Sequence, residues 1–291
     1  MKILAIGDNV ADKYLSRGKM YPGGQCFNTC VYAKMNGVDT AYLGKFGNDE
    51  VAALNKRVMD ELGIDRSRCR DFEGDNGFAL VTLKDGDRVF LGSNKGGIAK
   101  EHPFDFKEED LEYIKEFNVV YTNLNSYIEE DLPYIKKAGV PVAYDFSTRW
   151  TDEYLAKVCP HIDVALMSCA HLSDAEREKE MRKAAAYNVP LVLGTVGEDG
   201  SYLLYNGQIY YASAVKAKEV LDTMGAGDSY FATFLCSLLK SGNGKLLTEN
   251  ELENILRLQK AMQDGAAFAA DVCALEGAFG HGAPIEGKTE I

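Results

Sequence analysis

The sequence contains little tryptophan, histidine or proline, and it lacks a long hydrophobic run. Among 291 residues there are one tryptophan, four histidines and seven prolines. No stretch stays apolar over the roughly 20 residues that a membrane-spanning helix needs. The apolar start at residues 3–6 is too short for the core of a secretory leader and ends in Gly7-Asp8. We therefore expect a cytoplasmic protein that does not bind a membrane.

The cysteines and histidines lack the spacing of a metal site. The chain has seven cysteines, an odd number, with no Cys-x-x-Cys pair, and no histidine lies near enough to complete a zinc set. The histidines also have no nucleophile partner in sequence. We expect reduced thiols in a cytosolic protein, and no metal ligand can be assigned. The cysteines are Cys26, Cys30, Cys69, Cys159, Cys169, Cys236 and Cys273.

The charge balance is acidic. Lys and Arg number 32 against 44 Asp and Glu, which gives a formal net charge of -12. An acidic chain repels the phosphate backbone, so nucleic acid is not an expected partner. Hydrophobic residues make up 46% and charged residues 26%, the usual composition of a globular protein.

Short apolar runs alternate with amphipathic stretches along the chain. This alternation is typical of repeated β-α units and predicts an α/β fold with a mostly parallel sheet. No internal repeat or low-complexity linker divides the chain, so we expect a single domain over residues 1–291. The expected strands are 2–6, 40–43, 118–122, 140–144, 164–167 and 191–194, and the expected helices are 25–36, 51–62, 129–138, 175–187, 226–240 and 251–270.

One region departs from the β-α alternation. Residues 77–83 and 88–91 are apolar runs on either side of Asp85-Gly86-Asp87. An Asp-Gly pair between two apolar strands is a strong signal for a β-hairpin. Together with residues 12–20, the hairpin predicts a small antiparallel sheet that projects from the core.

The segment Asp222-Thr223-Met224-Gly225-Ala226-Gly227-Asp228 carries the strongest functional signal. It directly precedes an apolar helical run from Phe231. Glycines let the backbone approach a ligand closely, and the N–H groups at the start of the helix suit phosphate. A carboxylate at Asp228 could accept the proton of an attacking hydroxyl. By itself the motif would equally suit an ordinary helix start with an acidic residue in its first turn.

The segment Asp-Thr-x-Gly-Ala-Gly-Asp resembles the C-terminal signature of the ribokinase-like, PfkB-type sugar kinases. Three further blocks match that family in the same order. They are Gly7-Asp8-Asn9-Val10-Ala11-Asp12, Gly23-Gly24-Gln25-Cys26-Phe27-Asn28 and Thr195-Val196-Gly197-Glu198-Asp199-Gly200. Each block alone is weak, whereas all of them in family order over most of the chain are specific.

The resemblance implies a site and assigns its residues. Asp228 is the expected catalytic base, and an anion hole is formed by Gly225, Ala226 and Gly227. Sugar binding is expected from Asp8, Asp12, Gly24, Asn28 and Arg88, although Asp8 also suits a simple turn and Arg88 a solvated strand position. Nucleotide binding is expected from Thr195, Gly197, Gly200, Asp222 and Thr223. Arg149 either faces the phosphates or lies at the surface.

The same resemblance implies a fold, cofactors and an assembly. The fold is a three-layer α/β/α sandwich with a mostly parallel central sheet and a small β-sheet lid, formed by residues 12–22 and 77–100. The lid would close over the sugar and join two copies as a homodimer. The cofactors implied are ATP and Mg²⁺, with K⁺ as a further expectation because the loop 277–280 could supply backbone ligands.

Several details are similar to the fructoselysine kinase branch of the family, which phosphorylates a ketose linked to an amino acid. They include Gly7-Asp8-Asn9, Asp87-Arg88-Val89-Phe90 and Asp145-Phe146-Ser147 with Trp150. The expected reaction is ATP-dependent phosphorylation of the 6-hydroxyl of a fructosamine such as fructoselysine. Another ketose, a sugar acid or a nucleoside remains an alternative substrate, and a non-catalytic sugar- or nucleotide-binding protein is an alternative of another class.

An oxidoreductase is disfavoured, because no Gly-x-Gly-x-x-Gly follows the first strand. Two other local patterns differ from what the family or a known motif would require. The family's Asn-x-x-Glu is replaced here by Ser168-Cys169-Ala170-His171, which leaves the organisation of Mg²⁺ open. Residues 282–289 match a phosphate-loop pattern, but only Glu290 and Ile291 follow, so no helix can form there. We expect a frayed polar tail instead.

Overall fold

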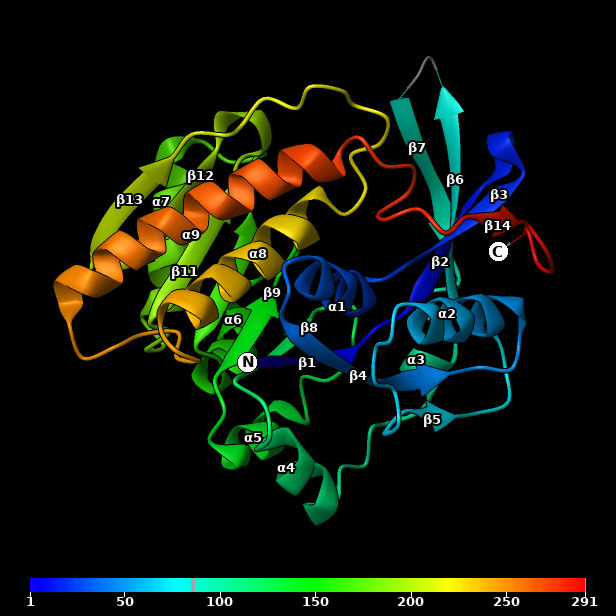
Figure 1. Ribbon diagram of the computed structural model, residues 1–291, viewed down its shortest axis with the longest axis horizontal. Helices are drawn as coiled ribbons and strands as arrows, with labels where there is room; N and C mark the ends of the chain where they lie inside the picture. The colour runs from blue at the N-terminus through cyan, green and yellow to red at the C-terminus, as the bar shows by residue number, and fades with distance from the viewer. Residues whose placement is uncertain (85–86, 291) are drawn as a thin grey trace.

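The computed structural model describes residues 1–84 and 87–290, without side-chain detail for residues 83–88. Within these residues a large sheet is covered by helices on both faces, and a smaller sheet projects from one end (Figure 1). The three-layer α/β/α arrangement that the resemblance implied is therefore confirmed.

In the described part of the chain the large sheet has nine strands in the order β13-β12-β11-β10-β9-β8-β1-β4-β5. Neighbouring strands from β11 to β5 run parallel, whereas β12 and β13 are antiparallel. The central strands are almost fully buried, as their continuous apolar runs predict. Their bounds are β1 Lys2–Gly7, β4 Asp39–Phe46, β5 Arg70–Asp71, β8 Val119–Asn123, β9 Val142–Asp145, β10 Val164–Ser168, β11 Leu191–Thr195, β12 Ser201–Tyr205 and β13 Gln208–Ala212.

Two hydrophobic layers fill the space between the sheet and its helices. One layer joins the sheet to α1 (Gln25–Met35), α2 (Glu50–Glu61), α8 (Ala226–Ser241) and α9 (Glu251–Val272). The other joins it to α4 (Glu108–Ile114), α5 (Leu132–Ile135), α6 (Asp152–Val158) and α7 (Asp174–Ala185). A short helix α3 (Ile98–Glu101) follows the small sheet. Helices α8, α9 and α1 lie together in front of the large sheet in Figure 1.

The small sheet has the strand order β14-β3-β2-β6-β7. Its strands are β2 Val10–Tyr14, β3 Lys19–Gly23, β6 Gly77–Lys84, β7 Asp87–Ser93 and β14 Ala283–Pro284. The antiparallel pair β6-β7 confirms the predicted hairpin, but its turn at 85–86 lies outside the described residues. The expectation of an antiparallel sheet was wrong at one position, because β2 and β6 pair in parallel. We call these five strands the lid sheet.

Two expectations about local structure were wrong. The helix expected over 129–138 is only α5 followed by a 3-10 turn at Lys136–Ala138, since Pro133 lacks the N–H that a regular helix would use. The C-terminal tail is not frayed in its described part. Residues of β14 pair with β3, and Lys13 Nζ donates to the backbone carbonyls of Glu286 and Lys288 at 3.2 and 2.8 Å.

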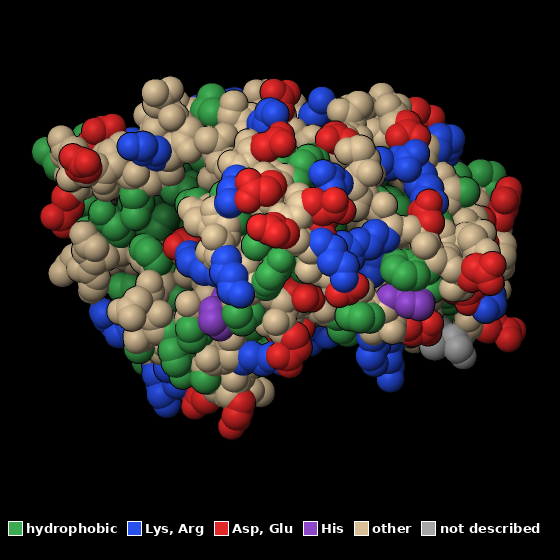
Figure 2. Space-filling view, turned by 90° about the horizontal axis from the view of Figure 1, so that it is seen from below, with side chains coloured by type: hydrophobic (Ala, Val, Ile, Leu, Met, Phe, Trp, Pro, Cys, Tyr) green, Lys and Arg blue, Asp and Glu red, His purple; other side chains and the backbone are tan. Residues whose placement is uncertain are grey.

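Both signs of charge are interspersed over the face shown in Figure 2. Among the described residues no helix is long and apolar enough to cross a membrane. All seven cysteines are free thiols, as expected from their spacing.

Candidate functional site

Polar side chains gather where three neighbouring parallel strands end. Asp8 directly follows β1, Asn123 is the last residue of β8, and Asp145 is the last residue of β9. Because the carboxyl ends of parallel strands meet at one edge of a sheet, these side chains lie close together. Asn123 Nδ2 donates to Asp8 Oδ1 at 2.7 Å. This edge of the sheet is the centre of the candidate site.

Asp8 is held at the start of α1. Its carboxylate accepts hydrogen bonds from the backbone N–H groups of Gln25 at 2.9 Å and Cys26 at 3.0 Å. It therefore caps the helix, which places a negative charge at the positive end of the helix dipole. Gly24 makes this approach possible: its φ is +103°, and an added Cβ would lie 2.9 Å from Asn9 Cα and 3.1 Å from Asp8 Oδ2. The predicted residues Asp8 and Gly24 are thus brought together.

The predicted base Asp228 lies in the first turn of α8 beside Asn28 of α1. Asn28 Nδ2 donates to Asp228 Oδ2 at 2.6 Å, which joins two residues 200 positions apart. Asp228 is 9% exposed. Asn28 Oδ1 is buried and has no hydrogen-bond partner among the described residues. A hydroxyl placed beside Asp228 could donate to this unused oxygen.

The environment of Asp228 sets its proton affinity. Burial raises the pKa of Asp228 to about 6, and the nearby Asp8 carboxylate adds to the rise, while hydrogen bonds from Asn28 and Gln25 oppose it. A carboxylate with this pKa is mostly ionised at pH 7 and is a stronger base than an exposed aspartate. It suits general-base chemistry near neutral pH.

The expected anion hole lies at the accessible start of α8. Gly225 has φ +77° and forms the N-cap. An added Cβ on Gly225 would lie 2.2 Å from the Tyr32 hydroxyl, whereas one on Gly227 would meet open space. Ala226 N–H donates to Thr223 O at 3.3 Å. In the described part of the chain the N–H groups of Gly225 and Gly227 have no such acceptor, so they are the better donors for an anion.

Asp222 connects the anion-hole turn with the lid sheet. The hydroxyl of Tyr14, on β2, donates to Asp222 Oδ2 at 2.6 Å, and Met224 N–H donates to Asp222 Oδ1 at 3.0 Å. Asp222 N–H in turn donates to Cys273 O. The Asp222 carboxylate is therefore bonded within the protein, while Thr223 beside it is exposed. Of these two residues, Thr223 is the one open to a ligand.

The predicted nucleotide loop follows β11. Thr195 is the last residue of that strand and Gly197 begins a 3-10 turn with an exposed backbone. Gly200 is buried with φ +98°, and an added Cβ would lie 2.2 Å from Ala212 O. The hydroxyl of Tyr230 on α8 donates to Ser201 Oγ at 2.8 Å, which fixes this loop beside the helix that begins at the anion hole.

Two predicted sugar residues belong to the lid sheet. Asp12 is 8% exposed on β2. A Cβ on Gly23 would lie 2.8 Å from Asp12 Oδ2, so the glycine of the predicted turn leaves room for this carboxylate. Arg88 is on β7, but its side chain is outside the described residues.

Sequence reasoning gave no function to Gln25, Asn125 and Asp145, which complete this edge, and left Arg149 either at the phosphates or at the surface. Asp145 Oδ2 accepts from Gln25 Nε2 at 2.9 Å, and Asn125 Nδ2 donates to Gln25 Oε1 at 2.8 Å. Arg149 Nη2 donates to Asn125 Oδ1 at 2.5 Å, with Arg149 at the exposed end of this chain of hydrogen bonds. Asp145 could have been found from its place directly after a predicted strand, at the edge where ligands of parallel sheets bind.

No set of three or more His, Cys, Asp or Glu residues in the described chain could hold a metal ion by itself. Ser168, where the family pattern has Asn, is the last residue of β10. An Mg²⁺ ion at this site would need phosphate oxygens and water as most of its ligands, which is its usual habit beside nucleotides. The loop 277–280 lies beside the expected anion hole, since an added Cβ on Gly225 would be 3.0 Å from Ala278 Cβ. The Ala278 carbonyl accepts from Tyr32 at 2.6 Å.

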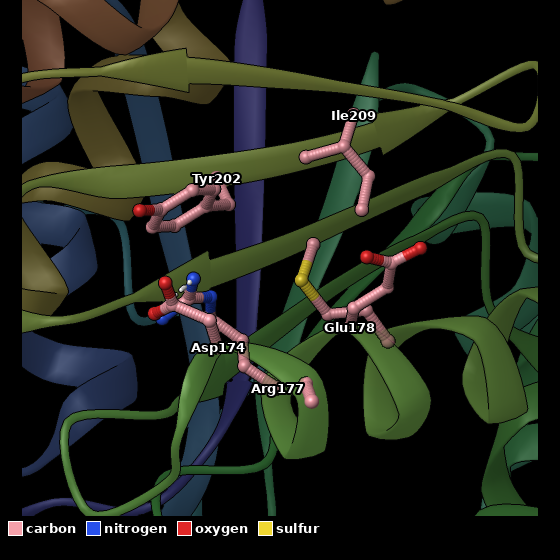
Figure 3. Close-up of a pocket in the computed structure, with 7 residues that line it drawn as sticks. Asp174, Arg177, Glu178, Tyr202 and Ile209 are labelled. Atoms are coloured by element: carbon pink, nitrogen blue, oxygen red, sulfur yellow. Dashed lines mark hydrogen bonds and ion pairs between the residues drawn. The ribbon is translucent and has the colours of Figure 1, made fainter.

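A cavity of about 440 Å³ lies elsewhere, between α7 and the strands β12 and β13 (Figure 3). The Arg177 guanidinium lies over the Tyr202 ring at 3.7 Å and is paired with Asp174 at 2.9 Å. None of the predicted site residues lines this cavity. The two carboxylates that line it, Asp174 and Glu178, are paired with Arg177 and Arg182. The strand edge with the buried Asp228 is therefore the stronger candidate for chemistry.

The chain is similar to known proteins over most of its length. The pfkB family of carbohydrate kinases matches residues 4–279. The chain is 36% identical over 285 residues to a fructosamine kinase of Bacillus subtilis (strain 168), covering 98% of this chain and 95% of that one. It is 31% identical over 280 residues to the fructoselysine 6-kinase of Shigella flexneri, covering 96% and 100%. A ribokinase of Arabidopsis thaliana, solved with ribose and ATP, has TM-score 0.78 and 22% identity, covering 95% and 94% of the two chains. The fold is ribokinase-like.

Proposed function

Since the chain belongs to the pfkB family of carbohydrate kinases, we propose that it transfers the γ-phosphoryl group of ATP to a hydroxyl of a fructosamine. The 6-hydroxyl of fructoselysine is the proposed acceptor. The observation that carries the proposal is Asp228, a buried carboxylate beside the open N-terminus of α8. The whole-length similarity to a fructosamine kinase supports the choice of substrate.

Asp228 acts as the base in this proposal. Its Oδ2 is held by Asn28 at 2.6 Å, and the carboxylate accepts the proton of the sugar hydroxyl. The pKa of Asp228 is raised to about 6, which increases its affinity for that proton and still leaves it mostly ionised at neutral pH. Asn28 Oδ1 can accept a second substrate hydroxyl, because it is buried and has no partner among the described residues.

The start of α8 stabilises the charge that develops during transfer. Gly225 and Gly227 lie at the N-terminal end of α8, which is the positive end of the helix dipole. Preorganised donors of this kind contribute ~10²–10³-fold each in other enzymes. Bound ATP supplies the phosphoryl group, and its Mg²⁺ neutralises phosphate charge. The proposed nucleotide-binding residues of the chain are Thr195, Gly197, Gly200, Asp222 and Thr223. Asp222 acts indirectly, by holding the turn through its bonds with Tyr14 and Met224 N–H.

The test is ADP release by purified protein with ATP and a panel of acceptors. The panel contains fructoselysine, fructose, ribose, a sugar acid and adenosine, and Asp228→Asn is measured in parallel. We expect selective turnover of fructoselysine that Asp228→Asn abolishes. A matched control is Asp39→Asn, which removes an exposed carboxylate at the opposite end of β4 and should leave turnover unchanged.

The other outcomes separate the alternatives. Selective turnover of another acceptor would support the proposed kinase activity and contradict fructoselysine as its substrate. Binding of ATP with only background turnover of every acceptor contradicts the catalytic proposal and favours a sugar- or nucleotide-binding protein.

The lid sheet is the proposed cover of the sugar and the proposed dimer contact. Strand β7 is an edge strand, and Phe90 and Leu91 on it are 64% and 49% exposed. Exposed apolar edges favour pairing with another chain. We expect a homodimer that Phe90→Glu converts to monomer, measured by light scattering during size exclusion. A wild-type monomer would contradict this assembly.

The proposed K⁺ site beside the loop 277–280 predicts faster turnover in K⁺ than in Na⁺ buffers.

A further inference from the structure

The sugar end of the site contains three carboxylates that no cation of the protein neutralises. Asp8, Asp145 and Asp228 are 4%, 3% and 9% exposed. Throughout the described ranges, no Lys or Arg forms an ion pair with any of them. Buried carboxylates are normally paired, because removal of charge from water is unfavourable. Two of the three already have functions in the proposed reaction, Asp8 as a sugar contact and cap and Asp228 as the base.

Both carboxyl oxygens of Asp145 are held by donors, and the residue lacks a cation. Its Oδ1 accepts the Ser147 N–H at 2.6 Å and its Oδ2 accepts Gln25 Nε2 at 2.9 Å. Both partners are donors, so both favour the ionised form of Asp145 over the protonated form. Both are neutral, so neither compensates the negative charge. A positively charged ligand group would complete this arrangement.

We propose that Asp145 determines substrate specificity by binding the protonated amine that links the sugar to its amino acid. This inference rests on the proposed function, because a fructosamine differs from the parent ketose by carrying that amine. An alkyl ammonium keeps its proton at neutral pH, as the lysine side chain does. The neutral ketose and ribose lack any group that could offset the charge of Asp145.

The position of Asp145 relative to the base supports this assignment. The Gln25 amide bonds to Asp145 and also lowers the pKa of Asp228, so it lies between the two carboxylates. A ketose whose hydroxyl faces Asp228 can therefore direct its substituent toward Asp145. Beyond Gln25, Asn125 and the exposed Arg149 continue toward the surface, where the amino-acid part of the substrate would extend.

The charges around Asp145 explain why it needs a cation. Burial raises the pKa of Asp145 to about 8, with further contributions from Asp228 and Asp8, while Ser147 N–H and Gln25 oppose the rise. Without ligand, Asp145 is therefore largely protonated at pH 7. Binding of an ammonium favours the carboxylate, so the proton leaves to solvent. The titratable groups that face this region are Asp8, Cys26, Tyr121, Asp228 and, through Asn125, Arg149.

The test compares fructoselysine with an isostere that has an ether oxygen in place of the linking nitrogen. We expect wild-type protein to prefer the amine in kcat/KM. Asp145→Asn should lower kcat/KM for the amine by about 10- to 100-fold, the range for a lost charged hydrogen bond, mostly through KM. It should lower kcat/KM for the ether much less, so that the ratio of kcat/KM for the amine to that for the ether falls. Asp39→Asn is again the control, and Asp145→Glu should retain a preference for the amine.

The inference would be overturned if the wild type had equal kcat/KM for the amine and the ether, or if Asp145→Asn lowered both values equally. Either result would leave the proposed kinase activity intact. Failure of wild type to phosphorylate any acceptor would instead contradict the proposed function. If Asp145→Asn does not fold, a measurement on the wild-type protein still tests the inference. Calorimetry in buffers of different ionisation enthalpy at pH 7, without ATP, should show proton release on binding fructoselysine and none with the ether. No difference between the two ligands would refute a role for Asp145.

Discussion

The sugar side of the candidate site is assembled from buried side chains, whereas the nucleotide side is assembled from backbone. On the sugar side Asp8, Asp145 and Asp228 are each held by donors from other elements. On the nucleotide side Gly197 and Gly227 are exposed. An acceptor with several hydroxyls needs fixed directional partners, while a phosphate chain is bound by N–H groups that any residue could supply. Side-chain changes should therefore be most damaging on the first side and backbone changes on the second.

The largest effect is expected for Asp228→Asn. Loss of the base should lower kcat by about 10²- to 10⁴-fold, with little change in KM, because the amide keeps the shape of the side chain. The thermal midpoint should not fall, since the variant removes a buried charge close to Asp8 and Asp145. Steady-state kinetics and a melting curve measure both. A residual kcat near that of the wild type would remove Asp228 from the mechanism.

Gly225→Ala and Gly227→Ala form a matched pair on the nucleotide side. At Gly225 the positive φ and the Tyr32 hydroxyl 2.2 Å from an added Cβ predict a loss of about 1–3 kcal/mol in unfolding free energy. At Gly227 the same methyl meets open space in the first turn of a helix. Alanine there should stabilise by up to ~1 kcal/mol yet raise KM for ATP, because the methyl blocks the approach of phosphate. Unchanged ATP kinetics in Gly227→Ala would argue against the anion hole.

Asn28→Ala tests whether the hydrogen bond from Asn28 sets the pKa of Asp228. Asp228 must be ionised to act, so kcat/KM should fall as pH drops through its pKa of about 6. Asn28 lowers that pKa by donating to the carboxylate, and its removal should shift the acid limb to higher pH. A loss of about 10-fold in kcat at neutral pH is expected for one charged hydrogen bond. The measurement is a pH-rate profile of the variant. If Asn28 were purely structural, its removal would reduce activity without shifting the acid limb of that profile.

The smallest effect is expected at the connection between the lid sheet and the anion-hole turn. Tyr14→Phe removes the hydroxyl that donates to Asp222 at 2.6 Å. Asp222 keeps its bond from Met224 N–H, so the turn should survive with a few-fold change in KM for ATP, equivalent to about 1 kcal/mol. A change in sugar KM alone would place the function of Tyr14 on the other side of the site.

Much of the fold follows from local patterns. The short apolar runs identified six strands of the large sheet because a strand buried on both faces must be apolar throughout. The hairpin followed from its turn chemistry. By contrast, the pairing of residues 283–284 with β3 was missed, because a two-residue strand has no periodicity and its partner lies far away in sequence. Helix 129–138 was overestimated because amphipathic spacing does not register the effect of Pro133.

In the candidate site, too, some residues could be predicted from local sequence and others depend on contacts between distant segments. The resemblance of short motif blocks to the family assigned Asp8, Gly24, Asn28 and Asp228 as expected site residues, since each block is contiguous in the sequence. Asp145 and Gln25 were not assigned, because their importance depends on which strand ends are neighbours. Nothing in the residues around Asp145 indicates that its charge lacks a cation.

By itself the sequence determined the alternation of strands and helices, the open start of α8 and the type of each group at the site. Only the tertiary structure decided that Asn28 lies against Asp228 and that Gln25 separates Asp228 from Asp145. The physical reason is that hydrophobic periodicity and turn chemistry act over a few residues. Burial and electrostatic repulsion, which raise the pKa values of Asp145 and Asp228, arise only when distant segments pack together.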